Sequence, residues 1–196
     1  MFHLQLIPLV QAIGYPGLFA VVFLESGVFF GFFLPGSSML FTAGLLATKG
    51  FFDPWLLIFL MWLAAVLGDN VGYWFGNKVG IRLFLRPDSR FFKHEYLERA
   101  KDFYDRHGAR TIVLARFVPI VRTFVPIVAG VVKMRYGAFL VYNLIGALAW
   151  AAGVTFLGYY LGEKLPFVQT YLTPIVLAII VVTSLPLLWE FRSSEK

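Results

Sequence analysis

The sequence predicts an all-α polytopic membrane protein with a single membrane domain over residues 1–196. Of its 196 residues, 59% are hydrophobic and 14% are charged, and the mean hydropathy is +0.76. A soluble domain of this length could not bury so much apolar surface. Within this class we expect an inverted repeat of a re-entrant helical hairpin plus a transmembrane helix, followed by an extra C-terminal transmembrane helix.

Charge and cysteine content exclude several kinds of function. The formal net charge is +6, but the basic residues lie mostly between and beside apolar segments, so membrane orientation explains them better than a nucleic-acid partner. The chain has no cysteine, which rules out disulfides, thiolate metal sites and cysteine nucleophiles. Walker, Rossmann and serine-nucleophile patterns are absent, and the histidines lack metal-ligand spacing. We therefore expect no metal, no cofactor and no enzymatic activity.

Proline and glycine divide the first apolar region. Residues 1–16 are predicted as a short interfacial helix, and residues 17–48 as the first re-entrant hairpin. The expected break within that hairpin is the run Pro35, Gly36, Ser37 and Ser38. Proline and glycine there would end one half-helix, and the serines could cap the next one. A helix broken at membrane depth is tolerated only where it is buried in protein or lines a water-filled cavity.

Charges separate the remaining segments. A long apolar run interrupted only by Asp69 predicts a spanning helix, and the polar stretch after it has the periodicity of an amphipathic helix. A later proline-broken run, whose only charges are Arg116 and Arg122, predicts a second hairpin. The expected segments are a transmembrane helix at 54–78, a cytoplasmic amphipathic segment at 79–110, re-entrant hairpin 2 at 111–132, and transmembrane helices at 136–162 and 167–190.

An internal repeat relates the two halves of the chain. Ala43-Gly44 recurs as Ala129-Gly130, and Gly72-Tyr73-x-x-Gly76-x-Lys78 recurs as Gly158-Tyr159-x-x-Gly162-x-Lys164, both 86 residues further on. One shared offset across two separate motifs is hard to attribute to chance. Each half therefore reads as a broken hairpin followed by a spanning helix.

The placement of basic residues predicts the topology. If each hairpin returns to its own side, the basic residues of 82–110, Lys133, Arg135, Arg192 and Lys196 share one face, and Lys49 and Lys164 lie on the other. The positive-inside rule makes the first face cytoplasmic, and with it the C-terminus of a multi-pass protein in the cytoplasmic (inner) membrane. The two halves are then inverted, which is typical of secondary transporters whose discontinuous helices meet near the bilayer midplane.

Two arginines in hairpin 2 are the strongest functional signal. A guanidinium in apolar surroundings costs at least about 2.5–3.5 kcal/mol on insertion scales, and arginine cannot lose its proton to avoid that cost. Arg116 and Arg122 are therefore expected to face a cavity, a partner charge or a bound anion. Helix amides near the hairpin breaks could supplement charge-assisted bonds to a phosphate. The candidate phosphate-binding residues are Arg116, Arg122, Ser37, Ser38 and Thr123. The residues expected to shape the hairpins are Pro35, Gly36, Pro119, Pro126, Gly130 and Gly72.

Two acids are candidates for proton coupling. Glu25 stands alone in a long uncharged region, and a carboxylate that loses hydration can change protonation near neutral pH. It could couple protons, serve as a counter-ion for Arg116 or Arg122, or tie broken helix ends together. Asp69 could pair with an arginine, join a proton path, or be a hydrated residue near the helix end. An alternative interpretation locks both arginines to both acids as a scaffold.

Several of these motifs resemble those of the DedA family of membrane proteins, also described as SNARE-associated or VTT-domain proteins. The resemblance covers about residues 20–165. Its motifs are Phe23-Leu24-Glu25-Ser26-Gly27, Leu34-Pro35-Gly36-Ser37-Ser38 with Ala43-Gly44, Gly68-Asp69-x-x-Gly72-Tyr73-x-x-Gly76, Arg116-Phe117-x-Pro119-x-x-Arg122-x-x-x-Pro126-x-x-Ala129-Gly130, and Asn143-x-x-Gly146-Ala147-x-x-Trp150. The resemblance implies two facing hairpins, an essential membrane acid at Glu25 and an essential arginine pair at Arg116 and Arg122. Many members carry an acid where this chain has Ser37, so Asp69 would have to substitute or coupling would differ.

The resemblance also sharpens the expected function. It implies a proton-motive-force-dependent lipid transporter or flippase, with undecaprenyl phosphate as the first candidate substrate. The expected partners are protons and a membrane lipid with an anionic phosphate headgroup. The alternatives are a phosphatidylethanolamine flippase or scramblase, a small-ion/proton antiporter, and a non-transporting membrane assembly factor. A homo-oligomer is left open.

Overall fold

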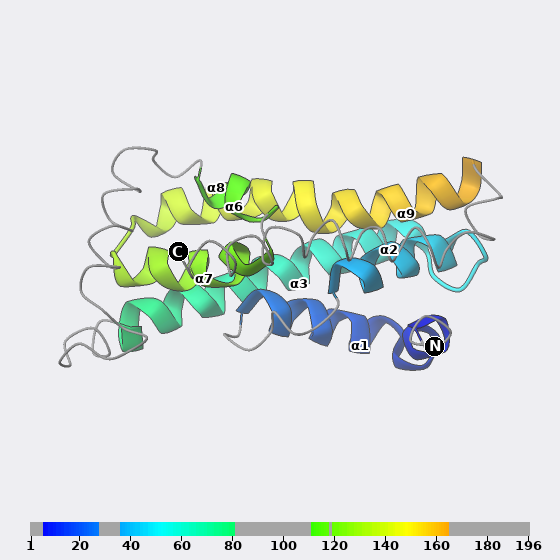
Figure 1. The fold of residues 1–196 in the computed structure, drawn as a ribbon, viewed down its shortest axis with the longest axis horizontal. Helices are drawn as coiled ribbons and strands as arrows, with labels where there is room; N and C mark the ends of the chain where they lie inside the picture. Colours follow the sequence, from blue (N-terminus) through cyan, green and yellow to red (C-terminus); the bar gives the residue numbers. More distant parts are fainter. Residues whose placement is uncertain (1–5, 28–35, 81–110, 118, 165–196) are drawn as a thin grey trace, which may run out of the picture. The chain divides into compact units, whose positions relative to one another are not determined.

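The chain folds entirely into helices and turns in the part that the structure describes, which confirms the all-α class. The computed structural model describes residues 6–27, 36–80, 111–117 and 119–164 (Figure 1). Two helices, α3 and α8, each run on into a π-helical segment. The helices are α1 (Leu6–Gly27), α2 (Gly36–Ala47), α3 (Pro54–Phe75) with η3 (Gly76–Gly80), α6 (Thr111–Ala115), α7 (Pro119–Val131), α8 (Tyr136–Ala147) with η5 (Leu148–Ala152), and α9 (Gly153–Lys164).

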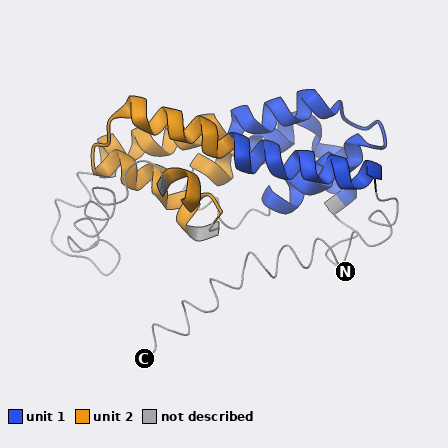
Figure 2. Cartoon of the chain, turned by 90° about the horizontal axis from the view of Figure 1, so that it is seen from above, with its two compact units in different colours: residues 1–22, 33–64, 148–196 blue, residues 23–32, 65–147 orange. Residues whose placement is uncertain are grey.

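The chain divides into two compact units, coloured separately in Figure 2. Unit 1 contains residues 1–22, 33–64 and 148–196, and unit 2 contains residues 23–32 and 65–147. The long helices α1 and α3 each contribute to both units. Both units therefore combine segments from the two halves of the sequence.

Three helices are long and apolar enough to cross a membrane, so the chain is a multi-pass membrane protein. They are Ile7–Gly27, Pro54–Val79 and Tyr136–Lys164. Two other apolar helices are too short to span a bilayer alone: α2 has 12 residues and α7 has 13. At 1.5 Å per residue each reaches only about 20 Å, against about 30 Å of hydrocarbon. Their lengths suit half-helices, but whether they re-enter the membrane stays a prediction.

The N-terminal region differs in detail from the expected division at residue 16. Helix α1 continues across that boundary to Gly27, and its backbone is broken at Gly14, where φ is 56° and ψ is −158°. Only glycine adopts such a backbone conformation without strain, and Pro16 follows within the same helix. The break therefore lies close to the expected boundary. The interfacial position of the preceding segment stays a prediction.

Some expected segments lie outside the described residues. These are most of the amphipathic segment 79–110, of which only 79 and 80 are described, the whole of the C-terminal transmembrane helix 167–190, and Pro35.

In unit 1, glycine brings helices α2 and α9 into backbone contact. A Cβ added to Gly44 would come closer than 3.0 Å to the backbone oxygen of Thr155, and one added to Gly158 would meet the backbone oxygen of Phe41 as closely. Real Cβ atoms essentially never lie so close, so these positions accept glycine alone. Small residues at helix crossings are the usual means of close packing in membranes.

Unit 2 repeats this arrangement with helix α7 on the end of α3. A Cβ on Gly130 would overlap the backbone oxygen of Tyr73, and a Cβ on Gly76 would overlap that of Ile127. Gly44 and Gly130 are 86 residues apart, as are Phe41 and Ile127. In both units the short helix of one half thus packs on the long helix of the other half. The repeat is visible in the packing, while its inverted orientation stays a prediction.

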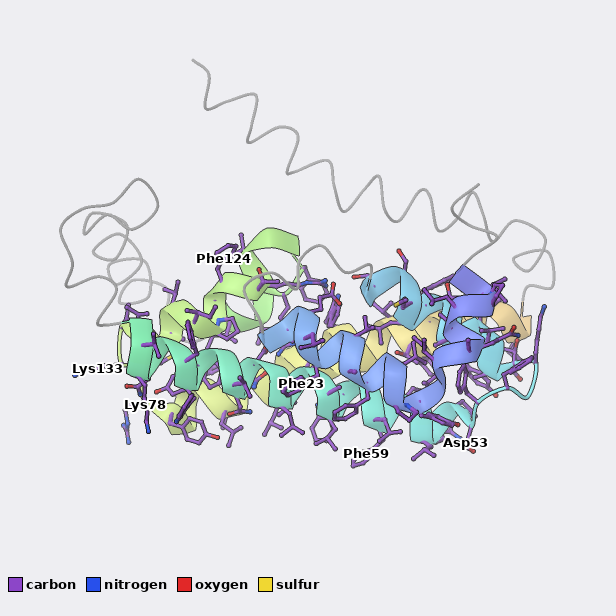
Figure 3. All side chains as sticks on the ribbon, turned by 90° about the horizontal axis from the view of Figure 1, so that it is seen from below. Phe23, Asp53, Phe59, Lys78, Phe124 and Lys133 are labelled. Carbon is purple, nitrogen blue, oxygen red and sulfur yellow. The ribbon has the colours of Figure 1, made fainter. Side chains whose placement is uncertain are left out.

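Helix α7 ends in a left-handed turn at Lys133, labelled in Figure 3. The Lys133 N–H donates to the Gly130 carbonyl at 3.1 Å, and the Met134 N–H donates to the Ala129 carbonyl at 3.0 Å. This is the Schellman arrangement, in which the left-handed residue is usually glycine. Tyr73 secures the turn by donating its hydroxyl to the Met134 carbonyl at 2.5 Å.

We expect Lys133→Gly to stabilise the protein. The residue has a φ of 53°, so removing its Cβ relieves local strain, for a net gain of about 0.5–1 kcal/mol after the added freedom of glycine in the unfolded chain. Thermal unfolding in detergent measures the effect. Lys133→Ala is the control, because it removes the rest of the side chain and keeps the strained Cβ. An equal gain from both variants would assign the effect to the lysine side chain.

Candidate functional site: two buried ion pairs

The first ion pair joins three elements of unit 2. Arg116 directly follows α6, Asp69 lies in α3 and Asn143 lies in α8. The Nη2 of Arg116 donates to Oδ2 of Asp69 and to Oδ1 of Asn143. The three residues are 5%, 3% and 0% exposed respectively. A buried guanidinium is therefore held by a carboxylate and an amide from two different helices.

Asn143 and Gly146 fit helix α8 to this arginine. The Nδ2 of Asn143 donates to the backbone oxygen of Val66 at 3.2 Å, which fixes the amide between α3 and Arg116. One turn further along α8, a Cβ on Gly146 would lie 2.8 Å from Cδ of Arg116 and 2.9 Å from its Nε. The missing side chain at Gly146 thus makes the room that the arginine occupies.

The second ion pair joins Arg122 and Glu25. Arg122 lies in the first turn of α7, and its Nη2 donates to Oε1 of Glu25, near the end of α1. The two side chains are 11% and 2% exposed. Helix α1 can approach α3 here because Gly27 and Gly68 face each other: a Cβ on Gly27 would overlap the backbone of Gly68. This close crossing is what buries Glu25.

The electrostatics of the two pairs are balanced. Two guanidinium groups face two carboxylates in an apolar helical unit, so the four side chains sum to no net charge. Removing a charge from water costs several kcal/mol, and pairing with good hydrogen bonds offsets that cost. Loss of one member would leave its partner uncompensated.

The pairing bears on the alternatives that the sequence left open. Each acid contacts one arginine, Asp69 with Arg116 and Glu25 with Arg122. This arrangement is the one expected by the scaffold interpretation and by the counter-ion interpretation of Glu25. Anion binding and proton coupling stay predictions.

The other candidate residues are distributed over both units. In unit 2, Thr123 is 2% exposed and follows Arg122, and Pro119 begins α7. Gly72 packs against Pro126, and a Cβ added to this glycine would lie 3.3 Å from the proline Cβ. In unit 1, Gly36, Ser37 and Ser38 form the first turn of α2. The expected meeting of the serines with the arginine pair stays a prediction.

Asn143 is the site residue to which the sequence assigned no role beyond its place in a motif. A lone amide in a long uncharged span is nevertheless a signal for a buried polar partner. In the described segments, no group of three or more His, Cys, Asp or Glu side chains is placed to hold a metal ion. The side chains that do meet here can pair charges, take up a proton and exchange one anion for another.

The fold and site define a multi-pass, all-helical membrane protein that holds paired charges within its apolar helices. The VTT domain matches residues 34–160 of the chain. The chain therefore belongs to the VTT-domain family, which confirms the resemblance to DedA proteins.

The individual relatives are also membrane proteins by name or description. The protein named DedA from Escherichia coli K12 is 46% identical over 174 residues, covering 88% of this chain and 79% of DedA. An uncharacterized membrane protein of Mycobacterium leprae is 45% identical over 185 residues, covering 92% of this chain and 82% of the relative. The inner membrane protein YqjA of Escherichia coli K12 is 33% identical over 192 residues, covering 91% of this chain and 86% of YqjA. No solved structure matches the chain.

Proposed function

We propose that this protein is a proton-dependent flippase for a membrane lipid with an anionic phosphate headgroup, with undecaprenyl phosphate as the first candidate. One observation carries the proposal: two buried arginine–carboxylate pairs lie within a unit built from apolar helices. Such groups are expensive in a membrane and usually mark a substrate or ion pathway. Membership of the VTT-domain family supports a role in the membrane.

The pairs supply a route for exchanging one anion for another. A guanidinium cannot stand alone in an apolar site, so its carboxylate leaves only when another anion arrives. Protonation of Glu25 removes the negative charge opposite Arg122. A lipid phosphate then takes its place through charge-assisted hydrogen bonds. Release of the lipid returns the proton and restores the ion pair, so each cycle couples one proton to one headgroup.

The second candidate function is a non-transporting assembly factor. It is favoured by the same observation, because both arginines already have acidic partners. In that case the pairs only hold helices together, and no anion displaces a carboxylate. The two functions differ in whether lipid moves.

Transport by the reconstituted protein tests the proposal. We expect liposomes containing the full chain to translocate labelled undecaprenyl phosphate, faster with a pH gradient than without one. Labelled phosphatidylethanolamine should move more slowly, because its headgroup carries a compensating positive charge. Arg122→Lys should reduce phosphate transport at least about tenfold, since an ammonium cannot reproduce the planar fork.

Arg135→Lys is the matched control, because Arg135 is exposed, and it should leave transport unchanged. Absence of lipid movement by folded protein, with or without a gradient, would support the assembly factor. Equal movement of both lipids would reject phosphate selectivity. Indifference of transport to Arg122→Lys would favour a small-ion path.

A further inference from the structure

We infer that the two arginines have different tasks: Arg122 is the guanidinium that meets the lipid phosphate, whereas Arg116 is a positioning residue that stays bound to Asp69 and Asn143 throughout. This inference rests on the proposed function and deepens it. It departs from the sequence-based expectation that both arginines bind phosphate.

The contacts of Arg116 leave little freedom for exchange. Its Nη2 is shared by two acceptors, from α3 and α8, and the amide acceptor is itself held by the Val66 carbonyl at 3.2 Å. The stem of the side chain fills the space above Gly146. To reach an incoming anion, Arg116 would have to break several buried contacts at once, each costly to leave unmade.

Helix ends also separate the two positions. Arg116 follows the C-terminal end of α6, where exposed carbonyls favour a cation and disfavour an anion. Arg122 lies in the first turn of α7, a helix of 13 residues whose first N–H groups have no acceptor within the helix. Such a terminus favours negative charge. The buried carboxylate of Glu25 already occupies this environment, and a phosphate would replace like with like.

Access agrees with this assignment. The side chain of Arg122 is 11% exposed, and that of Arg116 is 5% exposed. Asn143 then acts as a second positioning residue, because it links Arg116 to the backbone of α3 without carrying charge. The Arg116–Asp69–Asn143 cluster is a fixed neutral anchor, and anion exchange is confined to Arg122 and Glu25.

Two charge-matched double variants test the division. Asp69→Asn with Arg116→Gln removes the anchor pair, and Glu25→Gln with Arg122→Gln removes the exchange pair. Each deletes one positive and one negative charge from a buried position, a change that is often tolerated. The readout is the affinity of detergent-solubilised full chain for farnesyl phosphate, a short polyprenyl phosphate, between pH 5.5 and 8, with unfolding temperature as the check on folding.

We expect the exchange-pair variant to lose at least about tenfold in affinity, together with its pH dependence. The anchor-pair variant should lose no more than about threefold and keep the wild-type pH profile. Equal loss from both folded variants would overturn the division of tasks but leave phosphate binding intact. No binding by the wild-type chain, or no loss from either variant, would overturn the proposed function itself.

Single lysine variants cover the case in which a double variant does not fold. Arg116→Lys keeps a positive charge beside Asp69, and Arg122→Lys keeps one beside Glu25. We expect only Arg122→Lys to weaken farnesyl phosphate binding strongly, because only that position needs the planar fork for the ligand. A stronger effect of Arg116→Lys would contradict the inference.

Discussion

Asp69→Asn is expected to lower the free energy of unfolding by about 3–5 kcal/mol, the usual cost of breaking a buried ion pair from one side. The substitution keeps the shape of the side chain and removes its charge. Arg116, which is 5% exposed, then keeps its positive charge without the carboxylate that balances it. The guanidinium lies between two helices, so water cannot take the place of that carboxylate without opening their packing.

The unfolding temperature in detergent, followed by tryptophan fluorescence, measures this effect. For a chain of this size the expected fall is roughly 6–20 °C. Asp53→Asn is the matched control: Asp53 is exposed and accepts a hydrogen bond from the Leu56 N–H at 2.7 Å, which asparagine can also accept. A similar small change in both variants would show that the Arg116–Asp69 pair contributes little to stability.

A second substitution tests the partner assignment. Asn143→Asp added to Asp69→Asn returns one carboxylate and one amide to Arg116, in exchanged positions. We expect this double variant to recover most of the lost stability. Recovery will be incomplete, because an aspartate at 143 cannot donate to the Val66 carbonyl as Asn143 does. A double variant no more stable than Asp69→Asn alone would argue against the shared contact.

The class of protein and its broken helices followed from the sequence because apolar runs, proline and glycine act locally. The repeat identified Gly44 and Gly130 as equivalent positions, yet it did not reveal that each contacts the long helix of the opposite half. An offset in sequence shows which residues correspond. It does not show which helix each one meets, because that depends on tertiary packing.

The same limit applies to the site. Arg116, Arg122, Glu25 and Asp69 could be singled out because a charge in an apolar run needs a reason. Which acid pairs with which arginine could not be derived, since the partners are separated by 47 and 97 residues. Asn143 carries no charge, so its cost of burial is smaller and its signal weaker, although it contacts the same Nη2 as Asp69.

Gly130→Ala is expected to disrupt the packing of unit 2, because the added methyl group has no space to occupy. The new Cβ would overlap the backbone oxygen of Tyr73 and lie 2.7 Å from the backbone nitrogen of Asn77. Both are main-chain atoms, so no side-chain rotation relieves the clash. Helix α7 must move away from α3, at a cost at or above the usual range of about 1–3 kcal/mol for overpacking.

Moving α7 also moves Arg122, which lies on the same helix. We therefore expect Gly130→Ala to lower both the unfolding temperature and the affinity for farnesyl phosphate. Gly137→Ala is the matched control, because its Cβ would meet nothing within 4 Å and alanine favours the helical state of α8. Gly44→Ala, 86 residues earlier, should destabilise unit 1 through the equivalent clash with Thr155. If Gly130→Ala unfolds no earlier than Gly137→Ala, the two helix backbones are not in contact and the crossed packing of the repeats is wrong.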